Sequence, residues 1–400
     1  MKLYIVTREP FPNGMAATKR IRCYAKASVM SGMECEIVVF HRGEVYGTPP
    51  KNTIGEGDLD GYHFRYIGGT PLRASNVFRR QYDDFIDKVN TVRYLDRHLN
   101  EGDVVMQYLG EERHLSQRIV KTAHAHRCMV VRDLCEYPYA TKEETNANRR
   151  RLNSYLKNIL PKFDGTICIS EPLLQLAQMT CPNSIHIKVP ILVEAQDSSE
   201  VHHHVRPYIF HGGTMYERKD AIVSTMKAFG MACTALDKQI DFILAGPSSP
   251  HQAELDAIIT QYDMRQNVTF LPLLPHTEIS AYQNGAFAIV LNKNDNTQNR
   301  YGFSTKLGEV LMSGTPLITT TVGEANNWLK DGISAYIVAP HDPQLIASKI
   351  IEVFQHPEES KIIAQRGKEI AQKYFSLEYQ GNKMADYFKM LNKSKGYSTR

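Results

Sequence analysis

Short apolar runs alternate with longer amphipathic segments along the whole chain. Continuous apolar runs predict buried strands, and apolar residues that recur every three or four positions predict helices. In the first half we expect strands at residues 3–7, 36–40, 63–67, 104–108, 129–132 and 166–169, and helices at 18–30, 78–99 and 148–159. In the second half we expect strands at residues 208–211, 242–245, 268–271, 286–291, 317–319 and 335–338. This alternation is typical of doubly wound parallel α/β sheets.

A polar segment at residues 193–206 interrupts the alternation. It has no apolar period, as expected of a linker between domains. A chain of 400 residues is also too long for one hydrophobic core. We therefore predict two domains, residues 1–195 and residues 196–376. The last helical segment, residues 377–392, follows another helix without an intervening strand, and we expect it to pack back on the first domain.

Composition and charge narrow the class of partner. The formal charge of +4 is small and spread along the chain, so no nucleic acid partner is expected. The basic clusters Arg79–Arg80 and Arg149–Arg151 are candidates for peripheral contact with anionic lipid head groups. A solvated helix face is the simpler explanation for both clusters.

The cysteine pattern and the lengths of the apolar runs bear on the compartment. Seven scattered cysteines without a C-x-x-C pair predict free thiols in a reducing environment. No apolar run reaches the ~20 residues needed to span a bilayer. We therefore expect a cytoplasmic protein, with any membrane contact peripheral and on the inner face.

The segment at residues 301–320 carries the strongest functional signal. Its sequence, YGFSTKLGEVLMSGTPLITT, predicts a loop, a helix, a tight turn and a buried strand. Ser304, Thr305 and Lys306 fall at the start of the helix, where free N–H groups, hydroxyls and a cation together suit a phosphate. Glu309, one turn further on, is placed to accept hydrogen bonds from sugar hydroxyls. Helix capping also explains the two hydroxyls, and it is compatible with anion binding.

Other strand-to-helix loops hold further candidate ligand contacts. Gly14 lies in a turn of small residues that lets the backbone approach a ligand, although the G-x-G-x-x-G fingerprint is absent. Gly213, followed by Arg218 and Lys219, fits a backbone cradle for a diphosphate with positive charge beside it. Gly246 follows the next strand and is placed to shape a pocket wall. A plain turn for Gly14 and a solvated basic pair for Arg218 and Lys219 are the competing interpretations.

Two carboxylates close a strand of the first domain. Asp133 and Glu136 follow the strand at residues 129–132, where they are candidates for a general base or for orienting an acceptor hydroxyl. Surface charge, or an ion pair with Arg132, explains them equally well. No signature of a serine hydrolase or of a zinc protease occurs in the chain.

Taken together, these residues resemble the family-4 retaining glycosyltransferases, or glycosyl transferases group 1. The similarity covers nearly the whole chain and is strongest from residue 208 to residue 340. The residues that match the family's motifs are Gly302, Phe303, Glu309, Gly314, Pro316, Leu317, Ile318, Gly323 and Glu324, with the segment at 190–194, and Gly14 and Arg20 near the N-terminus.

The resemblance implies a GT-B fold, in which two Rossmann-like doubly wound domains face each other across a cleft. The first domain would bind the acceptor, and the second a nucleotide-sugar donor. The implied reaction moves a sugar from a nucleoside diphosphate-sugar to a hydroxyl of a glycan or lipid-linked acceptor, as in cell-surface polysaccharide synthesis. It uses no metal and no cofactor, since the leaving phosphate helps to deprotonate the acceptor. Asp133, Glu136 and Lys219 are the candidate catalytic residues.

The chain departs from the family's pattern at three places. Tyr301 replaces the first of the two signature glutamates, whereas Glu309, which holds the nucleotide ribose in the family, is retained. Gly213 or Thr214 stands where an arginine usually follows the loop glycine, and Lys306 is a candidate replacement for its charge. The family's first-domain histidine has no match, because Arg132–Asp133 occupies its position.

Two alternative functions remain open. One is a nucleotide-sugar epimerase on the same fold, although the loss of the first signature glutamate counts against it. The other is a catalytically silent GT-B protein that acts as a binding or partner subunit. Tyr301 and the missing arginine favour this second alternative.

Overall fold

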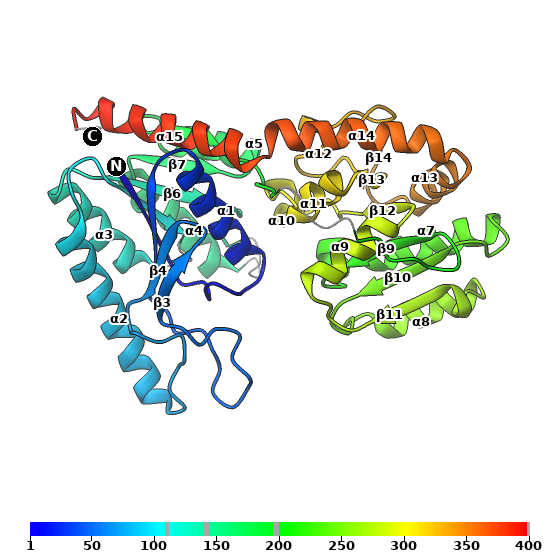
Figure 1. Ribbon diagram of the computed structural model, residues 1–400, viewed down its shortest axis with the longest axis horizontal. Helices are drawn as coiled ribbons and strands as arrows, with labels where there is room; N and C mark the ends of the chain where they lie inside the picture. The colour runs from blue at the N-terminus through cyan, green and yellow to red at the C-terminus, as the bar shows by residue number, and fades with distance from the viewer. Residues whose placement is uncertain (109–111, 140–144, 195–199, 398–400) are drawn as a thin grey trace. The chain divides into compact units, whose positions relative to one another are not determined.

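The computed structural model describes residues 1–108, 112–139, 145–194 and 200–397, and the chain divides into two compact units (Figure 1). Unit 1 comprises Met1–Leu192 and Leu377–Arg400, and unit 2 comprises Val193–Ser376. Residues 195–199 of the predicted linker lie outside the described residues. None of the helices in the described part of the chain is both long and apolar enough to cross a bilayer.

Unit 1 is built on an eight-stranded sheet in the order β3-β4-β2-β1-β5-β6-β7-β8. Every neighbouring pair is parallel except β3 and β4. The strands are β1 (Lys2–Thr7), β2 (Glu34–Val39), β3 (Glu56–Leu59), β4 (Tyr62–Tyr66), β5 (Val104–Tyr108), β6 (Met129–Leu134), β7 (Gly165–Cys168) and β8 (Ile185–Lys188). The helices are α1 (Ala16–Met30), α2 (Val77–His98), α3 (Arg113–Ala125), α4 (Asn146–Asn158), α5 (Glu171–Thr180) and α15 (Leu377–Ser394), with a 3-10 turn η1 at Leu160–Lys162.

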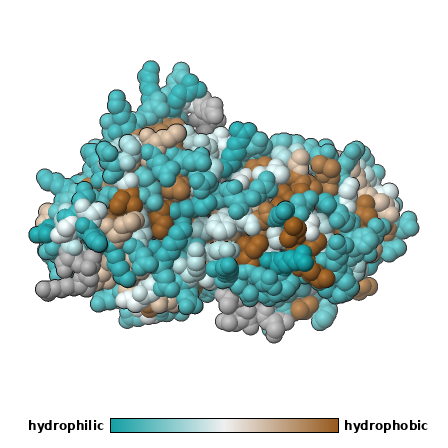
Figure 2. All heavy atoms as spheres, turned by 90° about the horizontal axis from the view of Figure 1, so that it is seen from above, coloured by the Kyte–Doolittle hydropathy of each residue, from teal (hydrophilic) through white to brown (hydrophobic). Residues whose placement is uncertain are grey.

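The C-terminal helix α15 is part of the core of unit 1. Its residues Leu377, Met384 and Phe388 belong to the same buried cluster as Leu3 and Ile5 of β1. Helix α15 packs on α1, which covers the same face of the sheet. The apolar runs that predict strands therefore lie in the hydrophobic core. Figure 2 shows mainly hydrophilic side chains, with smaller hydrophobic patches, on the face seen there.

Unit 2 has a six-stranded, wholly parallel sheet in the order β11-β10-β9-β12-β13-β14. The strands are β9 (Tyr208–Gly212), β10 (Asp241–Ala245), β11 (Val268–Leu271), β12 (Ala288–Leu291), β13 (Leu317–Thr320) and β14 (Tyr336–Val338). The helices are α6 (Glu217–Asp220), α7 (Ile222–Ala235), α8 (Gln252–Gln261), α9 (His276–Gly285), α10 (Thr297–Tyr301), α11 (Thr305–Ser313), α12 (Ala325–Trp328), α13 (Pro343–Gln355) and α14 (Pro357–Tyr374), with a 3-10 turn η2 at Arg265–Asn267.

The predicted fold class, doubly wound parallel α/β sheets, is confirmed, and every predicted strand is present. Two strands of unit 1, β3 and β8, were not expected. Both lie at edges of the sheet. Their sequences, EGDL and IHIK, are short and lack a continuous apolar run. Edge strands are only half covered, so the burial that marks the central strands is missing from their sequences.

Candidate functional site

Two glycine turns meet at the carboxyl edge of the sheet in unit 2. Gly213 follows β9 with a φ of +121°, and its N–H donates a 2.8 Å hydrogen bond to the carbonyl of Ala245. Gly246 follows β10, and a Cβ atom there would lie 2.1 Å from the Gly213 carbonyl oxygen. No side chain fits at Gly246, so the two turns expose adjoining backbone without side chains. We call the backbone of Gly213 and Gly246 the glycine surface. The structure therefore brings together two glycines that the sequence suggested separately.

The side chain of Lys306 reaches this glycine surface from the first turn of α11. Its Nζ atom is buried and has no hydrogen-bond partner among the residues that the structure describes. A Cβ atom on Gly213 would lie 2.9 Å from that Nζ atom, so the ammonium lies directly over the glycine. The nearest acidic group is the carboxylate of Asp220, whose Oδ1 is 3.8 Å away. The ammonium is thus desolvated and aimed at the place where a ligand would approach the turn.

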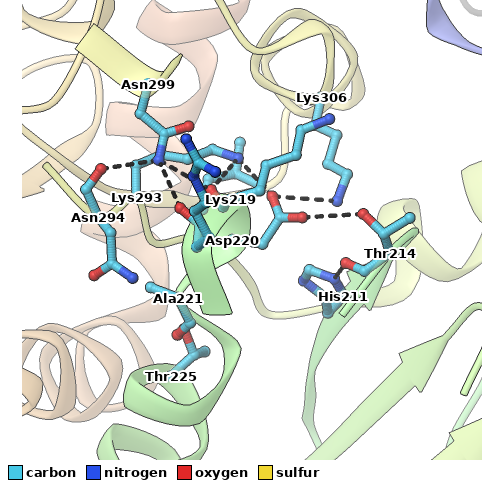
Figure 3. Close-up of polar contacts among 12 residues, drawn as sticks. His211, Thr214, Lys219, Asp220, Ala221, Thr225, Lys293, Asn294, Asn299 and Lys306 are labelled. Atoms are coloured by element: carbon cyan, nitrogen blue, oxygen red, sulfur yellow. Dashed lines mark hydrogen bonds and ion pairs between the residues drawn. The ribbon is translucent and has the colours of Figure 1, made fainter. Parts of the chain in front are cut away.

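Asp220 lies between two lysines, as Figure 3 shows. It is buried at the end of α6, and Lys293, two residues beyond β12, donates a 2.5 Å hydrogen bond to its Oδ1 atom. Thr214 donates a second hydrogen bond, of 3.3 Å, to Oδ2. Burial alone would raise the pKa of Asp220, but Lys293 and Lys306 outweigh it and hold the pKa well below its usual range. The carboxylate is therefore ionised at neutral pH.

His211 adds no charge to the group formed by Asp220, Lys293 and Lys306. Its Nε2 atom lies 3.0 Å from the carbonyl oxygen of Thr214, so Nε2 must carry a hydrogen and donate it. Burial, reinforced by Lys306, lowers the pKa of His211 to about 3. The imidazole is consequently neutral at physiological pH.

We call His211, Asp220, Lys293 and Lys306 the buried lysine cluster. Burial lowers the pKa of both lysines, and that of Lys306 falls to about 8. Lys306 is therefore mostly charged at neutral pH, and the ion-paired Lys293 is charged as well. Two ammonium groups share one carboxylate, which leaves one positive charge without a counterion. Burying an uncompensated charge destabilises the fold unless an anion binds beside it.

Asparagines after β12 hold α6 in place beside the cluster. Asn296 donates a 2.7 Å hydrogen bond to the carbonyl of Arg218, and Asn299 donates one of 3.2 Å to the carbonyl of Lys219 (Figure 3). Asn294 donates to the carbonyl of Glu217 at 2.6 Å. These contacts fix the backbone of α6, while the side chains of Arg218 and Lys219 stay exposed. Both side chains lie at the surface, on the short helix that also supplies Asp220.

The start of α11 matches the predicted anion site in part. Ser304 is the N-cap residue, and its hydroxyl makes no capping hydrogen bond. Thr305 begins the helix, so the sequence places both hydroxyls beside the unpaired N–H groups of the first turn. Glu309 follows Lys306 by three residues, on the same side of the helix. Its carboxylate is half-buried and lies 4.0 Å from Nε2 of His276.

Sequence analysis missed three members of the buried lysine cluster: His211, Asp220 and Lys293. Asp220 ends the polar run E-R-K-D, which resembles any solvated turn. A signal was nevertheless present in N-K-N-D-N-T-Q-N, the eight residues that follow β12. Such a concentration of asparagines beside a buried strand is typical of a loop that holds another loop by its carbonyls.

In unit 1, the side chain of Asp133 is buried. Tyr24 donates a 2.5 Å hydrogen bond to its Oδ1 atom, and Nη2 of Arg20 lies 3.6 Å from the same oxygen. Arg20 in turn donates to the carbonyls of Val189 and Pro190 at 2.9 and 2.8 Å. The ion pair of Asp133 with Arg20 ties β6 to α1 and to the end of β8.

The remaining candidates of unit 1 lie apart from that ion pair. Glu136 is exposed in the loop after β6. A Cβ atom at Gly14 would lie 2.0 Å from Oγ1 of Thr18, which donates a 2.8 Å hydrogen bond to the carbonyl of Pro10. The glycine is thus required by close packing of the turn that begins α1. Glu136 is the one carboxylate of the predicted pair that is accessible.

Replacing Asp133 with asparagine is expected to destabilise unit 1 by about 3–5 kcal/mol, because the buried guanidinium of Arg20 loses its counterion. Urea unfolding followed by circular dichroism measures this change. Glu136→Gln is the matched control, and we expect it to stay within about 0.5 kcal/mol of the parent chain. Equal stabilities of the two variants would contradict the structural role of Asp133.

Residues 194–370 match the family model of the glycosyl transferases group 1. No curated protein sequence matches the chain significantly.

Solved structures resemble the chain over nearly its full length at low sequence identity. Sucrose-phosphate synthase from Thermosynechococcus elongatus is 14% identical with a TM-score of 0.73, covering 98% of this chain and 99% of that one. HepE from Anabaena in complex with UDP is 13% identical with a TM-score of 0.69, covering 98% and 100%. The α,α-trehalose-phosphate synthase (UDP-forming) from Burkholderia xenovorans is 13% identical with a TM-score of 0.70, covering 96% and 99%. Unit 2, which holds the matched residues, therefore carries a domain of the glycosyl transferases group 1 family, and the chain as a whole has the GT-B fold.

Proposed function

We propose that the chain is a retaining glycosyltransferase that moves a sugar from a nucleoside diphosphate-sugar to a hydroxyl acceptor. The observation that carries the proposal is the unneutralised positive charge of the buried lysine cluster. A diphosphate at the glycine surface would supply the missing negative charge. As the sugar leaves, charge develops on that diphosphate, and fixed cations in a desolvated site stabilise it strongly.

The donor site is assigned to unit 2. Lys306 and the backbone N–H groups at the start of α11 would contact the diphosphate, with Ser304 and Thr305 donating from their hydroxyls. Arg218 and Lys219 add exposed positive charge on α6. Glu309 would accept hydrogen bonds from the ribose hydroxyls, and Gly213 and Gly246 would let the phosphates approach the backbone. The relatives with UDP in their descriptions favour a uridine nucleotide as the first donor to test.

The acceptor site is assigned to unit 1. Glu136 is the accessible carboxylate after β6, and we assign it to the acceptor hydroxyl. Asp133 then acts as a positioning residue that fixes the end of β6 through Arg20. We propose a glycan or lipid-linked acceptor and a cytoplasmic location, at the inner face of the membrane. The seven free cysteines support a reducing compartment.

A thermal-shift panel with UDP, GDP, ADP, CMP and the matching nucleotide-sugars tests the donor assignment. A nucleotide that binds only the native state stabilises it by about 2.7 kcal/mol at a hundredfold excess over Kd. We expect UDP to stand out. A flat panel would favour a silent partner protein, and release of an isomerised nucleotide-sugar without any acceptor would favour an epimerase.

Glu309→Gln is expected to abolish the thermal shift caused by UDP while the fold stays intact. The ribose hydroxyls would lose a charged acceptor, and hydrogen bonds to charged groups contribute about 1.5–3 kcal/mol each. Isothermal titration calorimetry measures the change in Kd. Glu278→Gln, an exposed glutamate of α9, is the matched control. Unchanged affinity in the Glu309 variant would refute its assignment to the ribose.

UDP binding is also expected to weaken as the pH rises above about 8. The pKa of Lys306 in the free protein is about 8, so the ammonium that would meet the diphosphate is lost above that pH. The association constant should fall about fivefold between pH 8 and pH 9 and approach a tenfold fall per pH unit above that, because binding requires protonation of Lys306. In Lys306→Arg the cation does not titrate in this range, so the profile should be flat. A flat profile in the parent chain would show that Lys306 does not meet the anion.

A further inference from the structure

Helix α2 of unit 1 exposes a stripe of aromatic side chains. Phe78, Tyr82 and Phe85 are 82%, 58% and 63% exposed. They are four and three residues apart, so they lie on one face of the helix. Large aromatic side chains are normally buried, and a contiguous exposed group of them usually marks a binding surface.

The opposite face of α2 is fixed to the rest of unit 1. Asp83 and Asp87 are buried on that face, where Arg42 lies 3.2 Å from an oxygen of Asp83 and donates a 2.8 Å hydrogen bond to Asp87. Further along the helix, Thr91 and Leu95 continue this buried side at four-residue spacing. These contacts prevent rotation of α2 about its axis. The three aromatic rings therefore point away from unit 1.

Neighbouring segments enlarge this apolar surface. The backbone N–H of Glu44 donates to the carbonyl of Pro71, and that of Arg73 donates to the carbonyl of Glu44. Tyr46, 74% exposed, follows the first of these segments, and Leu72 lies in the second, just before α2. In Figure 1 the start of α2 and the loop after β2 lie at the same end of unit 1. We define the α2 surface as Tyr46, Leu72, Phe78, Tyr82 and Phe85.

Two arginines lie beside the α2 surface. Arg79 and Arg80 lie in the first turns of α2, which contain no acidic residue before Asp83. Asp83 is already paired, with Arg42 at 3.2 Å and with Arg79 at 2.9 Å. The N-terminus of a helix adds further positive potential at this end. Aromatic rings flanked by arginines on a helix are typical of segments that lie in the interface of an anionic membrane.

We propose that the α2 surface docks unit 1 onto an anionic lipid bilayer. Phe78, Tyr82 and Phe85 insert among the head groups, and Arg79 and Arg80 contact lipid phosphates. A protruding stripe of rings suits a fluid bilayer, which deforms around it, better than a preformed protein pocket. The inference does not depend on the proposed sugar transfer, since it rests on side chains of unit 1 and the donor site is assigned to unit 2.

Sedimentation with vesicles tests the proposal. We expect the protein to sediment with vesicles of phosphatidylcholine and phosphatidylglycerol, but not with phosphatidylcholine alone, and to be released by high salt. Arg79→Gln/Arg80→Gln should lower the partition coefficient about thirtyfold. Phe78→Ser/Phe85→Ser should lower it by about tenfold for each ring removed. Phe78, Arg79 and Phe85 are exposed and Arg80 is half-buried, so the variants are expected to fold. An unchanged thermal unfolding curve followed by circular dichroism would confirm that.

Matched variants elsewhere in unit 1 serve as controls. Met179→Ser removes another apolar side chain, 78% exposed on α5. Arg149→Gln/Arg150→Gln/Arg151→Gln removes the exposed basic cluster of α4. Neither control should change the partition. Loss of binding in the α4 variant but not in the α2 variants would overturn the proposal, and so would the absence of sedimentation with anionic vesicles.

Tryptophan fluorescence tests directly whether the α2 surface enters the bilayer. Trp328 is the single tryptophan of the chain, so Trp328→Phe combined with Phe78→Trp gives one reporter on α2. Its emission should shift to the blue with anionic vesicles only. The same reporter built with Met179→Trp should not shift. If Phe78→Ser instead abolishes a concentration-dependent dimer and no vesicle binding occurs, the α2 surface joins two copies of the chain, and the membrane proposal is wrong.

Discussion

Replacing Lys306 with methionine is expected to weaken UDP binding about a hundredfold and, at the same time, to stabilise the free protein. The loss of affinity follows from the removal of one charge-assisted contact with the diphosphate, which contributes about 1.5–3 kcal/mol. A side chain that is needed only for packing would not be expected to produce these opposite effects.

The gain in stability follows from the state of Lys306 without ligand. Its ammonium is buried, has no hydrogen-bond partner and lies 3.8 Å from a carboxylate that Lys293 already engages. Methionine has an unbranched chain of similar length and adapts to irregular spaces. Removing the unsatisfied charge should therefore stabilise the fold by about 1–3 kcal/mol. Sites that are preorganised for a ligand commonly lower the stability of the free protein in this way.

Titration calorimetry with UDP and urea unfolding without ligand measure the two effects at pH 7. Lys219→Met is the matched control, because the side chain of Lys219 is exposed on α6. We expect the control to leave the free energy of unfolding within about 0.5 kcal/mol of the parent value. A destabilised Lys306→Met variant that still binds UDP normally would contradict the assignment of Lys306 to the diphosphate.

The position of Lys306 also explains a departure from the family's pattern. The resemblance implies an arginine directly after the loop glycine, whereas this chain has Gly213 or Thr214 there. A Cβ atom at Gly213 would lie 2.9 Å from the Lys306 ammonium, so the space beside the turn is already taken by a cation from α11. We infer that Lys306 supplies the charge that the arginine supplies in relatives.

The sequence predicts the parallel sheets and the α11 candidates because both depend on local patterns. Buried strands are continuous apolar runs, and Ser304, Thr305 and Lys306 follow one another at a helix start. The burial of Asp220 could not be predicted in this way. It depends on Lys293, which is 73 residues away in the sequence and reaches Asp220 only because β9 and β12 are neighbours in the sheet.

The same limit applies to Asp133. Its position after a strand correctly suggested the carboxyl edge of the sheet, where ligands bind. Whether its side chain faces a ligand or the core depends on Arg20 and Tyr24 of α1, more than 100 residues earlier. A charge pattern within a short window cannot distinguish these two environments.

Replacing Asp220 with asparagine is expected to destabilise unit 2 by about 3–5 kcal/mol. The variant leaves Lys293 and Lys306 buried without any counterion, and removal of one partner of a buried ion pair typically costs this much. Urea unfolding at pH 7 measures the effect. Asp237→Asn is the control, since Asp237 is exposed and asparagine tolerates its positive φ of 47°.

The difference between the parent chain and Asp220→Asn should depend on pH in one direction. The folded state holds the pKa of Asp220 below its ordinary value, so the unfolded chain takes up the proton first as the pH falls. The contribution is therefore complete above the unfolded pKa of about 3.9 and is lost as the pH falls through the lower folded value. Below about pH 4 the unfolding curves should therefore converge as the pH falls. A difference that grows below about pH 4 would contradict an ionised Asp220.

A double-mutant cycle connects the two predictions. In the parent chain the carboxylate of Asp220 partly offsets the cost of burying the Lys306 ammonium, and in Asp220→Asn that offset is absent. Lys306→Met should therefore recover more stability in the Asp220→Asn background than in the parent chain, with a coupling of about 0.5–3 kcal/mol. Strict additivity would mean that the two groups do not share one electrostatic environment. In that case the positive charge left over in the buried lysine cluster would no longer support a diphosphate as the ligand of unit 2.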